Sequence, residues 1–303
     1  MRTSIKALRS TPLLQAEFRA TSAHPRRFLG LLIVALLGLA SCIDFGPVRD
    51  FAALSKQAST GYSEIVQDMY QSCLRSAEFD PPVDGGTPET QCAEWKQVQP
   101  GLLKAESAFQ DYLAAIGKLG GNETVSYDDN LDSLKQALEN TTLSGKAVFD
   151  PKQVDAATGL AGFLLKAATD AYRRRELERA FSTQNESLQT VIAALKEIVG
   201  HDYEKRLENE ETAITAFQVR VQRASDQSLA AEIGRREAQE HLWDIAKKKE
   251  AADSYIKTLD LIANGHQQLY EHKKDLSSKV LAKSLADDVS KMIPLIQAIQ
   301  KAF

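Results

Sequence analysis

The residues of this chain best suited to covalent chemistry are its three cysteines, Cys42, Cys73 and Cys92. A thiol can be modified, paired in a disulfide or used as a metal ligand, and the neighbouring sequence favours one of these fates. Cys42 ends a run of apolar residues, whereas Cys73 and Cys92 stand on either side of a turn-rich segment. The three cysteines therefore predict two different roles.

The apolar run before Cys42 predicts an export signal. Residues 28–40 read FLGLLIVALLGLA and follow Arg26 and Arg27. A helix that spans a bilayer needs about 20 such residues, so this run is short for a permanent anchor. A buried core helix is the alternative, but a run without a polar face does not suit an amphipathic position. We predict that residues 1–41 are a secretory signal peptide that is removed from the mature protein.

Leu39-Ala40-Ser41-Cys42 resembles the lipobox of bacterial lipoproteins, in which a branched apolar residue and two small residues precede a cysteine. The resemblance implies a diacylglyceryl group on the sulfur of Cys42, cleavage between Ser41 and Cys42, and acylation of the new amino terminus by a fatty acid such as palmitate. Two or more acyl chains give stable membrane anchoring. Ile43 stands where the family associates Asp with retention in the inner membrane, so the resemblance implies the outer membrane, facing the periplasm. It covers the export segment alone and implies no fold.

The charge distribution argues against nucleic acid as a partner. The whole chain carries a net charge of −4, but residues 1–41 hold six basic residues and one acidic residue. The remainder is therefore strongly acidic, whereas phosphate binding requires clustered positive charge.

Cys73 and Cys92 predict a disulfide, since exported proteins meet an oxidising compartment. Both lie in helical patterns, and DPPVDGGTP at residues 80–88 separates them as a loop. In an antiparallel hairpin Cys73 lies about 9 Å and Cys92 about 6 Å from the loop ends of their helices, at 1.5 Å per residue. A bridge closing this loop stabilises by roughly 3 kcal/mol. A redox or metal-binding pair is the alternative, but neither a CxxC motif nor a nearby histidine supports it.

The rest of the sequence predicts an all-α fold, an elongated antiparallel bundle with long, coiled-coil-like helices. No proline occurs between residues 152 and 293, and apolar residues recur at helical spacing from Leu188 to Val221 and from Ile245 to His266. We predict a tether at 42–50, a helical hairpin region with the disulfide at 51–141, and a long-helix bundle at 152–303 that packs with it as one domain. Helix breaks are predicted at 200–202, 225–228 and 275–278, with a last helix bent at Pro294.

Motifs for catalysis or metal binding are absent from the sequence. Metal sites in helical bundles often use Glu-x-x-His, and none of the histidines at 201, 241, 266 and 272 has Glu three residues before it. His266 falls in the apolar seam and predicts a core histidine. Ser254 and Lys257 match SxxK without the motifs that accompany it in acylating enzymes. We predict no metal site, no catalytic residue and no cofactor beyond the lipid on Cys42.

The remaining candidates are charge runs and long helical faces. Arg173, Arg174 and Arg175 could contact an acidic partner, although solvated residues paired with nearby glutamates explain them more simply. The favoured function is a lipid-anchored periplasmic protein that binds or scaffolds another envelope protein. The alternatives are a ligand- or metal-binding sensor or accessory subunit and, third, an unrecognised envelope hydrolase.

Overall fold

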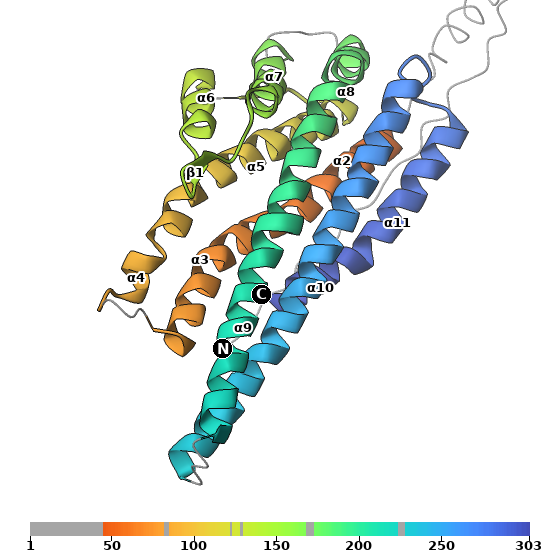
Figure 1. Ribbon diagram of the computed structural model, residues 1–303. Coiled ribbons are helices and arrows are strands. Elements are labelled where there is room, and N and C mark those ends of the chain that lie inside the picture. The colour runs from red at the N-terminus through yellow and green to blue at the C-terminus, as the bar shows by residue number, and fades with distance from the viewer. Residues whose placement is uncertain (1–44, 82–84, 122, 128–129, 168–172, 224–227) are drawn as a thin grey trace, which may run out of the picture. The chain divides into compact units, whose positions relative to one another are not determined.

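Helices make up almost all of the regular structure in the computed structural model, as the sequence predicts (Figure 1). The structure describes residues 45–303 except 82–84, 122, 128–129, 168–172 and 224–227. Residues from Asp44 to Phe303 form one compact unit, so the two predicted helical regions pack together. The predicted signal peptide, Ser41 and Cys42 lie outside the described residues.

The elements run in the following order. The first part of the chain holds α2 (Gly46–Ser59), α3 (Gly61–Phe79), α4 (Pro88–Gln91), α5 (Ala93–Gly120), α6 (Leu131–Glu139), β1 (Thr142–Leu143) and β2 (Lys146–Ala147). The second part holds α7 (Pro151–Ala167), α8 (Arg173–Glu197), the π-helical segment η1 (Ile198–Tyr203), α9 (Glu204–Arg223), α10 (Leu229–Glu271) and α11 (Lys279–Ala302). The antiparallel pair β1–β2 lies between the two helical regions that the sequence predicts, 51–141 and 152–303.

The chain becomes helical earlier than predicted. Helix α2 begins at Gly46, inside the span 42–50 that was predicted to be a tether, and Pro47 occupies its first turn. Proline suits this position because the first turn needs no amide donors. A second difference is that the predicted hairpin region begins with two helices, α2 and α3, which Thr60 separates.

The long helices bury the residues that the apolar period selects. Leu188, Ile192, Leu195, Val199, Tyr203, Leu207 and Ile214 are all at most 2% exposed. On α10, Ile245, Ala252, Leu259 and His266 are buried in the same way. Because these residues recur at three, four or seven positions, one face of each helix meets the core while the other faces water.

The predicted breaks are confirmed at two of three places. Ser228 caps α10 by accepting a hydrogen bond from the amide of Ala231, and α10 ends at Glu271, before α11 begins at Lys279. The predicted break at residues 200–202 is wrong, since the helical winding continues there as η1. Pro294 lies inside α11. Among the described residues, no helix combines the length and the apolarity that crossing a membrane requires.

A glycine in the middle of α10 allows α2 to approach it closely. A Cβ atom placed on Gly265 would lie 2.3 Å from Cε2 and Cζ of Phe51, which is closer than real contacts allow. Phe51 is 1% exposed, so its ring has little room to move. Gly265 therefore sets the distance between these two helices.

We expect Gly265→Ala to destabilise the protein by about 1–3 kcal/mol, because the methyl group overpacks the contact with Phe51. The measurement is urea unfolding followed by circular dichroism. Gly162→Ala in α7 is the matched control, since its Cβ would lie 3.8 Å from the nearest atom, Cδ1 of Leu131. The control should gain up to about 1 kcal/mol from helix propensity. Equal stability of both variants would show that the Phe51 contact does not limit α10.

Candidate functional site

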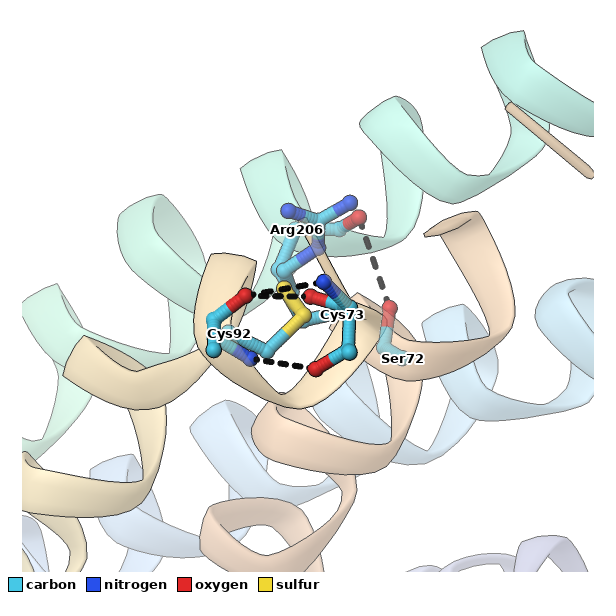
Figure 2. The surroundings of a disulfide bond; sticks show 6 residues. Ser72, Cys73, Cys92 and Arg206 are labelled. Carbon is cyan, nitrogen blue, oxygen red and sulfur yellow. Dashed lines mark hydrogen bonds between the residues drawn. A yellow bond between two sulfur atoms is a disulfide. The ribbon is translucent and has the colours of Figure 1, made fainter. Parts of the chain in front are cut away.

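The structure joins Cys73 and Cys92 in a disulfide, as predicted, with their Cα atoms 5.8 Å apart. Cys73 lies in α3, and Cys92 lies between α4 and α5, so the bridge closes the predicted helical hairpin. Figure 2 shows Arg206 of α9 beside the sulfur atoms, and the hydroxyl of Ser72 donates to the backbone carbonyl of Arg206 at 3.5 Å. The disulfide therefore sits at a junction of three helices.

One turn away from the disulfide, α3 carries a buried carboxylate with four donors. Arg75 binds Asp68 through Nη1 at 3.0 Å and Nη2 at 3.3 Å. The hydroxyl of Tyr203 donates to Oδ2 at 2.7 Å, and Nζ of Lys248 donates to Oδ1 at 3.0 Å. These donors come from α3, η1 and α10, so the carboxylate of Asp68 links three helices.

The same guanidinium extends the cluster to α9. Arg75 donates from Nε and Nη2 to the two oxygens of Glu210, at 2.6 Å and 3.1 Å. Glu210 is completely buried and Lys248 is 6% exposed. The side chains of Asp68, Arg75, Glu210 and Lys248 are called the ion cluster below. Its two anions and two cations balance, and Lys248 also pairs at 2.7 Å with Asp244, whose side chain is 43% exposed.

The electrostatics of the ion cluster favour the charged forms of Asp68 and Arg75. Burial alone would raise the pKa of Asp68, but Arg75, Lys248 and the Tyr203 hydroxyl outweigh burial and lower it. Burial and the charge of Asp68 raise the pKa of Tyr203. All four carboxylate oxygens of the cluster already accept side-chain donors, so neither acid is free to bind a metal or to move a proton. The cluster holds helices together.

A π-helical segment delivers Tyr203 to the cluster. The π-helix inserts a residue relative to α-helical winding and commonly occurs at sites where a side chain is redirected. η1 ends at Tyr203, whose hydroxyl reaches Asp68, and glutamate and lysine partners follow in α9 and α10. The sequence thus marks a real irregularity at residues 200–202. The irregularity is π-helical winding and not the predicted helix break.

A second buried acid lies between α5 and α3. Glu106 is 4% exposed, and burial raises its pKa to about 8, although Gln110 and the amide of Ser63 donate to it. The rings of Tyr62 and Tyr255 lie 5.8 Å apart, and the charge of Glu106 raises the pKa of both beyond the effect of burial. Within the described residues, neither tyrosine hydroxyl has a hydrogen-bond partner. A pKa of about 8 favours the protonated form of Glu106 at neutral pH.

His266 is a core histidine, as its position in the apolar seam predicts. It is 1% exposed, with Nε2 2.8 Å from the hydroxyl of Tyr112 and Nδ1 2.9 Å from Oδ1 of Asn185. Burial lowers its pKa to about 3. Burial keeps the imidazole neutral, and the hydrogen bonds of its two ring nitrogens link α5, α8 and α10 to one another.

The other sequence candidates do not assemble into a site. Ser254 is buried, whereas the Lys257 side chain is 60% exposed and paired with Asp253, so the SxxK pattern places no lysine at the serine. Arg175 is exposed on α8, and the side chains of Arg173 and Arg174 lie outside what the structure describes. In the described ranges, no group of three or more His, Cys, Asp or Glu residues could hold a metal ion.

Comparisons with known proteins agree in finding no match, whether with a family model, a curated protein or a solved structure. The function is therefore argued from this chain alone. Sequence reasoning missed the ion cluster because its members are far apart in the chain, with 180 residues between Asp68 and Lys248. The only local signal was that charged residues occupy positions of α3, α9 and α10 at which the helical period predicts apolar residues.

We expect Lys248→Met to lower the free energy of unfolding by roughly 3 kcal/mol, since it leaves buried negative charge less compensated. Lys257→Met in the same helix is the matched control, because its ion pair with Asp253 is exposed and worth at most about 1 kcal/mol. Urea unfolding at neutral pH measures both. A loss of equal size in the two variants would mean that the cluster contributes nothing particular to stability.

The second prediction concerns Glu106, whose pKa is about 8 in the folded protein and 4.5 in an ordinary environment. Between these values the unfolded chain releases a proton that the folded chain keeps, so this group makes stability fall as pH rises. Glu106→Gln removes that dependence. Relative to wild type, the variant should become more stable as the pH rises from 5 to 8, by up to about 1.4 kcal/mol per pH unit. Above pH 8 the difference should stay constant.

Thermal unfolding across this pH range checks the prediction. Glu250→Gln, at an exposed position of α10, is the control and should follow the wild-type profile. Parallel profiles for wild type and Glu106→Gln would mean that the carboxyl is already ionised in the folded protein.

Proposed function

We propose that this chain is a lipid-anchored protein of the bacterial cell envelope, held by acyl chains on Cys42. The observation that carries the proposal is the lipobox-like Leu39-Ala40-Ser41-Cys42 at the end of the apolar run 28–40. Such a cysteine would be the first residue after cleavage. The absence of aspartate at Ile43 supports an outer-membrane position facing the periplasm.

The start of the helical unit is consistent with a short anchor. Helix α2 begins at Gly46, four residues after Cys42. An extended chain spans at most about 3.6 Å per residue, so an acylated Cys42 would hold the start of α2 within roughly 15 Å of its lipid. A lipid anchor would thus keep this end of the folded unit close to the bilayer.

The disulfide supports an oxidising compartment. Cys73 and Cys92 are 5% and 0% exposed, which is typical of a structural bridge and not of a reactive pair. Structural disulfides persist in exported proteins and are rare in reducing cytosol. The bridge therefore agrees with the export that the N-terminal segment predicts.

Within the envelope, we assign the helical unit a binding or scaffolding role. Its buried acids and histidine hold helices together and leave no reactive group free at the sites described above. Long helical faces suit recognition by packing, which needs shape and apolar contacts in place of catalytic residues. The specific observation favouring this role is a helical hairpin with exposed apolar residues, the end of α9 and the start of α10.

Lipidation is tested by growing cells with radioactive palmitate and isolating the protein. The wild type should carry the label and fractionate with the outer membrane, and Cys42→Ala should lose both the label and membrane association. Ser41→Ala is the matched control, because alanine keeps a small residue before the cysteine and should leave labelling intact. Equal labelling of wild type and Cys42→Ala would refute the anchor.

A further inference from the structure

The hairpin of α9 and α10 extends beyond the rest of the helices (Figure 1). Its last contacts with α3 are made by Phe79, whose ring lies 5.3 Å from the rings of Phe217 and His241. Arg220 also donates to the carbonyl of Phe79, at 2.6 Å. Beyond this point, the two helices support each other, with Phe217 packed on Gly234.

The start of α10 carries a strip of exposed residues at coiled-coil spacing. The strip consists of Leu229, Ile233, Arg236, Glu240, Trp243 and Lys247. They are separated alternately by four and three residues, so they lie on one side of the helix. Leu229 is 74% exposed, Ile233 is 56% exposed and Trp243 is 62% exposed. The opposite side of the same stretch is buried, as the small exposures of Ala231, Ala238 and Ile245 show.

Nearer the body of the bundle, α11 covers part of the same side of α10. Ser254 and Gln268 continue the spacing of the strip, and Ser254 is buried while Gln268 donates to Asp288 of α11 at 3.3 Å. Lys247, the last residue of the strip, borders a hollow lined by Ala298 and Lys301 at the end of α11. The strip is therefore the part of a helix-packing face that extends past the end of α11. Single exposed apolar residues are common, but three on one heptad strip indicate a partner helix.

We propose that the strip binds the same strip of a second copy of this chain, antiparallel and about a twofold axis. In this pairing Ile233 packs on Trp243 of the partner subunit, and Leu229 packs on the aliphatic stem of Lys247 of the partner subunit. Arg236 meets Glu240 of the partner subunit. Each pair of contacting residues then joins an a position of one helix to a d position of the other, as antiparallel coiled coils require.

Charge complementarity selects a second copy as the occupant. Arg236 and Glu240 stand at the centre of the strip and pair within one chain at 3.2 Å. In the twofold arrangement each of these charges also meets its opposite, whereas a shift by one heptad places Glu240 against Leu229 of the partner subunit or against Trp243 of the partner subunit. Polar residues at core positions fix register in this way. The mixed charge of the strip gives an anionic membrane surface no comparable advantage.

The contact is small, and this sets the expected affinity. The overlapping segments run from residue 229 to 247, about 27 Å of helix at 1.5 Å per residue. Two such helices bury less than the roughly 1,600 Å² of a standard stable interface. The isolated dimer is therefore weak. The proposal does not rest on the lipid anchor, although anchoring on one membrane would raise the effective concentration.

Cysteine cross-linking tests the register. The protein is the chain from residue 42 onward with Cys42→Ser, which contains the whole compact unit and leaves only the native disulfide. Ile233→Cys and Trp243→Cys variants are oxidised separately and as a mixture. The mixture should form the dimer that joins the two different chains, and each variant alone should cross-link poorly, because like positions are about 15 Å apart along the axis. Equal cross-linking in all three samples overturns the arrangement.

Sedimentation over a range of concentrations tests the association itself. Ile233→Glu should raise the dissociation constant at least about tenfold. Val280→Glu, which replaces a residue of α11 that is also 74% exposed, should leave it unchanged. Arg236→Glu should weaken the dimer, and adding Glu240→Arg should restore it. A cooperative thermal melt shows that each variant is folded.

Three results contradict the proposal. One is a wild type that stays monomeric at the highest concentration measured. Another is a charge reversal that the second substitution does not rescue. The third is a monomer that binds anionic phospholipid vesicles in a manner lost in Ile233→Glu, since this would assign the strip to a membrane surface. Loss of the lipid label in Cys42→Ala bears on the anchor alone, so the two proposals fail separately.

Discussion

The carboxylate of Asp68 is the interaction on which the arrangement of the long helices depends. It is buried in α3, yet its donors come from η1 and α10 as well as from α3 itself. Removing a charge from water costs several kcal/mol unless excellent partners replace the water, so only one relative position of these helices is acceptable. Apolar packing alone tolerates sliding by a turn. The ion cluster does not, because Arg75 must reach Asp68 and Glu210 together.

The disulfide and the ion cluster both act on α3. Cys73 lies two residues before Arg75, so the covalent bond to Cys92 fixes α3 against the start of α5 while the guanidinium fixes it against α9. The disulfide reduces the conformational entropy of the unfolded chain. The ion pairs act in the folded chain, where any packing that separates them leaves buried charges unpaired. Together they leave α3 little freedom, and the hairpin of α9 and α10 is therefore held rigidly at its base.

Much of this architecture follows from local patterns in the sequence. The apolar period predicts the buried side of α8 to α10, and a turn-rich segment between two helical cysteines predicts the bridge. The interruption at Thr60 leaves no such pattern, and at residues 198–203 the sequence marks an irregularity without showing that it is π-helical winding. The ion cluster was hidden for a different reason. A charged residue on the core-facing side of a helix needs a partner that only the tertiary fold brings near. For Lys248 this partner is Asp68, 180 positions earlier in the chain.

The exposed strip on α10 follows from a difference in helix length. α10 has 43 residues and α11 has 24, and α11 ends at Ala302, beside Lys247. The strip on the remaining stretch continues, at the same spacing, into Ser254 and Gln268 in the part of α10 that α11 covers, although nothing in the described chain covers the strip itself. Solvent exposure alone would favour charged residues at all six positions of the strip, yet Leu229, Ile233 and Trp243 occupy three of them. A second helix that continues the packing where α11 stops explains both the spacing and the choice of residues, and the opposite charges at the centre explain why that helix can belong to an identical chain.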